Sequence, residues 1–182
     1  MYSHFLRSLQ NFFYYHSFIW LIVALAGFII IWGLIEYWLH KHPVIYTVFN
    51  ILAFGLSVFV IISSTLFYRS SQSYAVSFVP FSLFVRSFSD PIIFMSLVMN
   101  VVVFIPFGLF GACLFRCDSK KSAVIIISSG FAFSVLIELI QYALSIGNTE
   151  VDDVICNTLG ITLGYLFYYL YDRYIIQKKS KD

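Results

Sequence analysis

Five long apolar runs take up most of the sequence, at residues 18–39, 44–68, 92–115, 123–146 and 151–175. A helix rises about 1.5 Å per residue, so about 20 apolar residues cross the roughly 30 Å hydrocarbon core of a bilayer. Within that core, helices satisfy all their backbone hydrogen bonds internally. The sequence therefore predicts an all-α fold, a polytopic membrane helical bundle of about five transmembrane helices.

The composition supports a membrane location and argues against several classes of function. Hydrophobic residues make up 60% of the chain and charged residues only 11%, against roughly a quarter charged in an ordinary soluble domain. The net charge is +2, too small to indicate a nucleic-acid partner. The three cysteines lack paired spacing and the four histidines are scattered, so we expect no metal and no cofactor.

Residues 69–90 interrupt the apolar pattern. This stretch is rich in serine and aromatic residues, contains Pro80 and ends at Asp90, which makes it too polar and too broken to span a membrane. We expect a loop at the membrane interface, with the segment around Val79, Pro80 and Phe81 covering the end of the bundle.

The basic residues predict the orientation of the chain. Lysine and arginine in short loops are retained on the cytoplasmic side. With five spans, one side receives Lys41, Arg116, Lys120, Lys121, Arg173, Lys178, Lys179 and Lys181, and the other receives Arg7, Arg69 and Arg86. We therefore expect the N-terminus outside and the C-terminus in the cytoplasm.

Polar residues inside three of the runs fall at one depth. Asn100 lies about two helical turns from the outer end of the third run, and Glu138 and Gln141 lie a similar distance from the outer end of the fourth. The fifth run starts on that side with three further polar residues, Asp152, Asp153 and Asn157. The helices are therefore predicted to bring these groups together at the outer end of the bundle.

A carboxylate in hydrocarbon is costly, so Glu138 is expected to face polar partners or a hydrated recess. Arg69 and Arg86 are the cations on that side, and we expect one or both to approach the carboxylates. The candidate site is a ligand-binding or functional polar cluster, made of Arg69, Asn100, Glu138, Gln141, Asp152, Asp153 and Asn157. In the alternative interpretation, the same groups only join helices by hydrogen bonds.

Small residues predict where helices pack closely. Gly160 and Gly164 lie on one face of the fifth run, and Gly108 and Gly111 give the third run a similar smooth surface. Such faces let two helix backbones approach each other closely.

The order and spacing of these motifs resemble the VanZ-like family. The matching motifs are Val79-Pro80-Phe81 after Arg69, Asn100 with Phe104, Pro106 and Gly108, Glu138 with Gln141, Asp152-Asp153, and Asn157-Thr158-Leu159-Gly160 with Gly164. The family's usual arginine shortly before the acidic pair is absent here. The resemblance divides the chain into 1–64 (an N-terminal tail, the first span and most of the second), 65–175 (the VanZ-like membrane domain) and 176–182 (a cytoplasmic tail).

The resemblance implies a small bacterial multi-pass membrane protein, of a family associated in some members with lowered susceptibility to teicoplanin or other lipoglycopeptides. Together with the orientation, it predicts an outward-facing polar pocket that binds or alters an envelope amphiphile. The expected partners are a membrane lipid, a lipid-linked envelope component or a lipoglycopeptide antibiotic. The residues leave open an enzyme acting on a lipid or lipid-phosphate headgroup, a structural or transport role, and a homo-oligomer.

Overall fold

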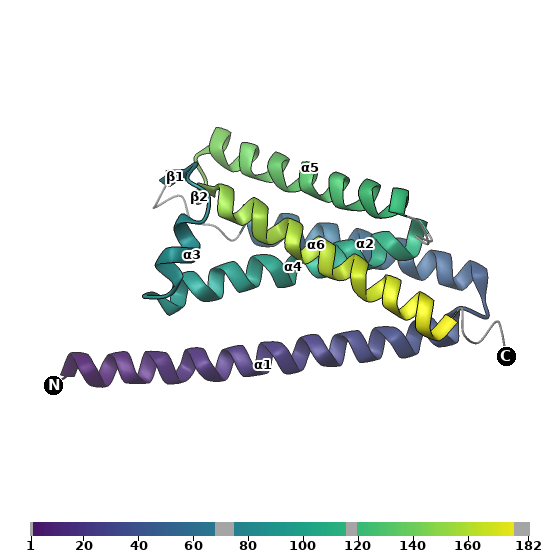
Figure 1. Cartoon of the computed structure of the whole chain (residues 1–182), viewed down its shortest axis with the longest axis horizontal. Helices are drawn as coiled ribbons and strands as arrows, with labels where there is room; N and C mark the ends of the chain where they lie inside the picture. The colour runs from purple at the N-terminus through teal and green to yellow at the C-terminus, as the bar shows by residue number, and fades with distance from the viewer. Residues whose placement is uncertain (1, 68–74, 116–119, 177–182) are drawn as a thin grey trace.

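A computed structural model describes residues 2–67, 75–115 and 120–176 of the chain. Five long helices dominate it: α1 (Tyr2–Leu39), α2 (Pro43–Ile62), α4 (Pro91–Phe115), α5 (Lys120–Leu144) and α6 (Val151–Tyr171). Short π-helical segments, η1 (Ser63–Phe67) and η2 (Asp172–Ile176), extend α2 and α6. Figure 1 shows the long helices side by side, with the start of α1 and the end of α6 at opposite ends of the bundle.

The predicted membrane spans are confirmed to within a few residues at each end. Within the described residues, five helices are long and apolar enough to cross a bilayer, at Phe18–Leu39, Pro43–Leu66, Pro91–Phe115, Lys121–Leu144 and Val151–Ile176. Many large apolar side chains on these helices point away from the bundle and are exposed. Such a surface suits contact with lipid.

Proline marks the starts of two of the long helices. Pro43 is the first residue of α2 and Pro91 the first of α4. Proline favours this position because its fixed backbone angle suits a helix and its missing N–H would have had no intrahelical partner. The residue before a proline is disfavoured in a helix, so α1 ends at Leu39 and a short turn precedes α2.

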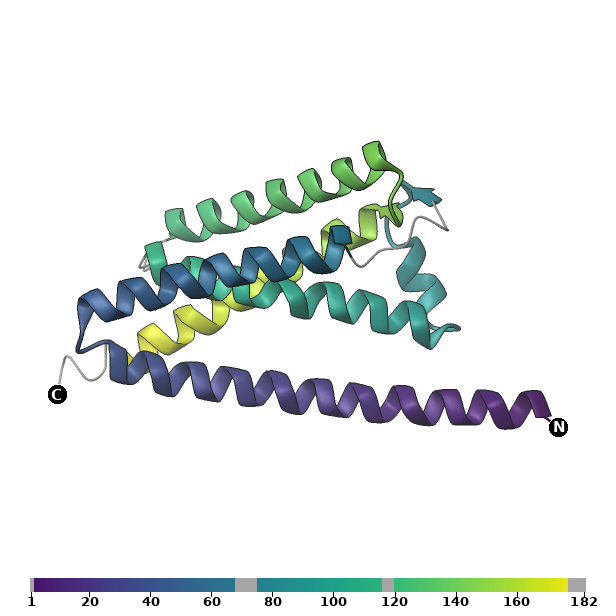
Figure 2. The same cartoon turned by 180° about the vertical axis from the view of Figure 1, so that it is seen from behind.

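The centre of the bundle is the contact between α4 and α6, which cross each other more closely than the other helix pairs (Figure 2). Gly160 of α6 lies against the backbone carbonyl of Val101, and Gly164 lies against that of Ile105. Gly108 of α4 in turn faces the backbone of α6. The close approach predicted from these glycines is therefore present in the structure.

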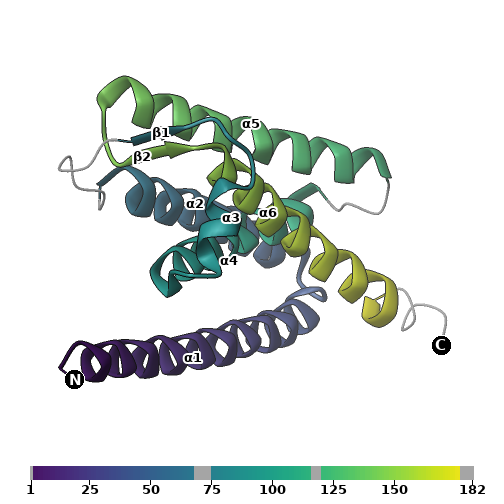
Figure 3. The same cartoon turned by 60° about the vertical axis from the view of Figure 1, so that its left-hand side comes forward.

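Two short strands and a short helix close one end of the bundle. Strand β1 (Ala75–Ser77) pairs in parallel with β2 (Asn148–Glu150), and α3 (Ser82–Ser87) follows β1. Figure 3 shows these elements gathered near the start of α6. We predicted a loop over residues 69–90, whereas its described part contains β1 and α3. Strand pairing between segments about 70 residues apart leaves no local pattern from which it could be predicted.

Helix α1 runs along one side of the bundle (Figures 1 and 2). Its contacts with α2 and α4 are sparse compared with those between α4 and α6. Trp32, Glu36 and Leu39 are its buried side chains among the residues whose burial is described. Among the α1 side chains from Phe18 onward, the buried ones therefore lie in the last two turns or so, from Trp32 to Leu39.

Candidate functional site

The carboxylate of Asp152 anchors the closed end of the bundle. Asp152 lies in the first turn of α6 and is 1% exposed. Its Oδ1 accepts a hydrogen bond from the backbone N–H of Phe81 (2.5 Å), and its Oδ2 accepts one from the N–H of Leu83 (2.7 Å). Phe81 has a left-handed backbone (φ 63°). Backbone N–H groups around such a residue form a concave site for an anion, and here the anion is a side chain of the same protein.

Asp153, the next residue, turns toward α4. Its Oδ1 accepts a hydrogen bond of 2.6 Å from Nδ2 of Asn100, which lies in the middle of α4. Asp153 is itself buried. The adjacent carboxylates of Asp152 and Asp153 thus serve different elements, one joining α6 to the start of α3 and the other joining α6 to α4.

Glu138 of α5 is bound to the strand that leads into α6. Its Oε2 accepts a hydrogen bond of 3.0 Å from the backbone N–H of Glu150 in β2. This contact spans the turn between α5 and α6, where Gly147 has a positive φ of 65°. Glu138, Asp152 and Asp153 are therefore all buried near the start of α6, each with an N–H donor.

The two remaining amide side chains extend the cluster toward other helices. Nδ2 of Asn157 donates to Oγ of Ser134 on α5 (2.9 Å), and Nε2 of Gln141 donates to the carbonyl oxygen of Thr65 on η1 (2.9 Å). Gln141 and Asn157 are buried, and Oε1 of Gln141 and Oδ1 of Asn157 have no hydrogen-bond partner among the described residues. The cluster therefore contains two buried acceptor oxygens without a donor among the described residues.

The structure brings together most of the residues that the sequence singled out. Asn100, Glu138, Asp152, Asp153 and Asn157 join α4, α5, β2 and α6 at one end, whereas Gln141 faces η1. Arg69 lies outside the described residues. Arg86 is exposed on α3, and both carboxylate oxygens of Asp152 accept hydrogen bonds from backbone amides.

Sequence reasoning missed several partners in this cluster. Thr65 and Glu150 contribute backbone atoms, which no residue type reveals, and Ser134 is an ordinary small residue in an apolar run.

The described residues contain no group of three or more His, Cys, Asp or Glu side chains placed to hold a metal ion. With both oxygens of Asp152 bonded to amides, that carboxylate is suited to fixing the closed end of the bundle.

The segment that Asp152 holds presents an exposed apolar surface. We call Phe78, Val79, Phe81, Val85 and Phe88 the apolar cap surface; these side chains are between 59% and 91% exposed. Leu83, by contrast, is buried and points into the bundle. Large exposed apolar patches mark contacts with membranes or partners. This patch lies at one end of the five candidate membrane spans.

The five spans, the tight crossing of α4 and α6, and the buried polar end define a multi-pass membrane helical bundle. The family model described as VanZ/LLP1 matches residues 18–172. The chain therefore belongs to the VanZ/LLP1 family, and the resemblance inferred from its motifs is confirmed. The match begins in the first span, ahead of the region in which those motifs lie.

A curated relative is similar over part of the chain. Protein VanZ of Enterococcus faecium is 38% identical over 90 residues, which cover 47% of this chain and 52% of the relative. The matched region thus spans about half the length of that relative. No solved structure matches this chain.

Proposed function

We propose that this protein binds an amphiphile of the cell envelope at the closed end of its bundle, facing the outside of the cell. The observation that carries the proposal is the apolar cap surface, which is held over the buried carboxylates by the two hydrogen bonds to Asp152. Exposed Arg86 on α3 adds a cation beside that surface. Apolar side chains next to a cation suit a ligand with an acyl chain and an anionic headgroup.

In this proposal the buried cluster and the cap surface have separate tasks. The carboxylates are 7% exposed or less, so a headgroup does not reach them while the cap is closed. They fix β1, α3 and the start of α6 relative to α4 and α5. The ligand's tail contacts the cap surface and its headgroup stays in the interface. The ligand classes are a lipid-linked wall precursor and a lipoglycopeptide such as teicoplanin, in line with the family's association.

The outward orientation rests on the distribution of charge. Among described residues, the end of the bundle with the α1–α2 turn contains Lys41, Lys120, Lys121 and Arg173, whereas the opposite end contains Arg86 on α3 and Arg7 near the start of α1. Basic residues mark the cytoplasmic side. The cap end therefore faces outward, where lipid-linked precursors and antibiotics are encountered.

Exposed phenylalanines give a sharp test, because their replacement does not disturb the buried cluster. Phe78→Ser and Phe88→Ser remove two side chains of the cap surface, and Phe115→Ser is the matched control, since Phe115 is 67% exposed at the other end of the bundle. Binding of teicoplanin, a lipid-linked wall precursor and phosphatidylglycerol is measured by native mass spectrometry of the purified protein.

We expect the two cap variants to lose at least several-fold in affinity for the precursor or for teicoplanin, while Phe115→Ser binds like the wild type. Equal binding by all three variants would refute the proposal. Release of a product from the labelled lipid would instead show an enzyme acting on the headgroup.

A further inference from the structure

A second buried polar group lies toward the opposite end of the bundle. Glu36 of α1 is 2% exposed, and the polar side chains around its carboxyl group are Trp32, Asn50 and Cys113. Asn50 comes from α2 and Cys113 from α4. Along α6, Asp152 and Tyr171 mark the two ends, about 28 Å apart at about 1.5 Å per residue. The tight crossing of α4 and α6 separates the two polar regions.

The hydrogen bonds around Glu36 are incomplete. Oε1 of Glu36 and Oδ1 of Asn50 have no partner among the described residues, and neither has Nε1 of Trp32. Nδ2 of Asn50 has two hydrogens; one is donated to the carbonyl oxygen of Tyr46 (3.0 Å), and the other is available to the Glu36 carboxyl group. An ionised carboxylate and an amide oxygen are both acceptors, so they cannot bond to each other without an additional hydrogen.

The other groups near Glu36 do not supply a compensating charge. The titratable side chains on this side are Tyr46 from α2, Cys113 from α4 and Tyr171 from α6. No lysine, arginine or histidine in the described part of the chain acts on the Glu36 carboxyl. A carboxylate buried in a membrane without a cation is strongly disfavoured.

We propose that Glu36 is a proton-binding site, with its carboxyl group protonated in the folded protein at neutral pH and its O–H donating to Oδ1 of Asn50. One proton satisfies both unpartnered acceptors and removes the buried charge. This site is distinct from the apolar cap surface and goes beyond the function proposed for it. When the proton is released, the O–H bond breaks, the proton passes to water and the electron pair stays on the carboxylate.

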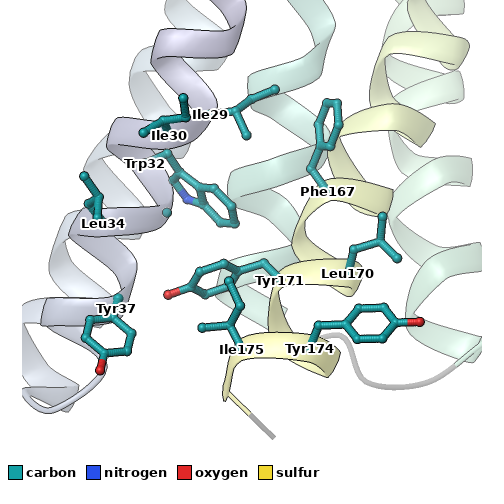
Figure 4. A pocket seen from close by; sticks show the side chains of 11 residues that line it. Ile29, Ile30, Trp32, Leu34, Tyr37, Phe167, Leu170, Tyr171, Tyr174 and Ile175 are labelled. Carbon is teal, nitrogen blue, oxygen red and sulfur yellow. The ribbon is translucent and has the colours of Figure 1, made fainter. Parts of the chain in front are cut away.

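Release of the proton would alter an adjacent groove. Trp32 and Tyr171 face each other across the space between α1 and α6, with ring centroids 5.0 Å apart (Figure 4). Both line an open apolar groove of about 660 Å³. Their N–H and O–H groups have no partners among the described residues, and together with Nδ2 of Asn50 and the thiol of Cys113 they are donors available to an ionised Glu36. Deprotonation would thus draw the two rings toward Glu36 and reshape the groove.

Infrared spectroscopy of the full chain in lipid nanodiscs tests the proposal, because a protonated carboxyl has a C=O band that shifts in D₂O. The variants are Glu36→Gln, which imitates the neutral acid, and Asn50→Leu, which removes the acceptor. Asp90→Asn is the control, since Asp90 lies between α3 and α4, outside the spans. Size-exclusion chromatography verifies that each variant is folded.

At pH 7 we expect Glu36→Gln to lose one deuterium-sensitive carboxylic C=O band that Asp90→Asn retains, and Asn50→Leu to move that band to higher frequency. If Glu36→Gln loses a carboxylate band instead, Glu36 is ionised and the proposal is wrong. A band that disappears on addition of Na⁺ or K⁺ would show a cation site and also overturn it. Should Glu36→Gln fail to fold, an unchanged spectrum of Asn50→Leu would overturn it equally.

Discussion

Replacing Gly164 by alanine should destabilise the bundle at the crossing of α4 and α6. A Cβ at this position would lie 2.7 Å from the backbone nitrogen of Leu109 and closer still to the carbonyl oxygen of Ile105. Ordinary contact of a Cβ begins at 3.4 Å. Relieving the contact with the nitrogen alone requires a separation of about 0.7 Å, and the closer carbonyl oxygen requires more, since neither atom belongs to a side chain that can move aside.

The cost of that separation follows from lost dispersion contacts. A gap of 0.5–1 Å removes about a quarter to a half of the attraction between facing atoms. For about 50 atom contacts of about 0.15 kcal/mol each, a loss of one quarter costs about 2 kcal/mol. This value lies within the range of about 1–3 kcal/mol for overpacked cores. For a chain of this size it lowers Tm by about 4–8 °C.

Gly55→Ala is the matched control for this experiment. Gly55 lies in the middle of α2, and a Cβ there would meet nothing within 4 Å. Alanine is a better helix former than glycine by about 1 kcal/mol, so this variant should be as stable as the wild type or more so. Tm is measured by fluorescence-detected size exclusion after heating in detergent. If Gly164→Ala is no less stable than Gly55→Ala, the close crossing of α4 and α6 is not what holds the bundle together.

Three further predictions concern the cap and the orientation. Asp152→Asn keeps only one acceptor oxygen for the two backbone amides, so amide hydrogen exchange at Phe81 should accelerate about 30-fold, the equivalent of about 2 kcal/mol. Unchanged exchange would mean that the carboxylate does not hold the cap. Gln141→Leu leaves a buried carbonyl of η1 without its donor and should cost about 1–3 kcal/mol in thermal stability, whereas an unchanged Tm would mean that water satisfies the carbonyl. In a cysteine-free background, a membrane-impermeant thiol reagent should label Ser89→Cys but not Lys41→Cys on intact cells; the reverse labelling pattern would place the cap in the cytoplasm.

Part of the candidate site could be predicted because depth in a membrane is a local property. Counting residues from the end of each apolar run placed Asn100 and Asp153 at similar levels, and the two side chains form a hydrogen bond of 2.6 Å. The same counting placed Gln141 at that level. It did not reveal that Gln141 faces Thr65 on η1, because the direction in which a helix face points depends on its neighbours.

The role of Glu36 illustrates a different limit. The sequence shows one acidic residue near the end of an apolar run, where such side chains often reach the interface. The structure buries it between α1, α2 and α4, with Asn50 and Cys113 beside it. Whether such a carboxyl group is buried or reaches water depends on how the three helices pack against one another.

The sequence by itself determined the spans, the small-residue faces and the level of the polar residues. The free energy of transferring a segment from water to lipid is a sum over its consecutive residues. The spacing of residues on one helix face is fixed by the backbone geometry. Only the tertiary structure decided that Asp152 bonds to the amides of Phe81 and Leu83 and that β1 pairs with β2. These contacts join backbone groups of segments about 70 residues apart, and a backbone group is the same in every residue type except proline.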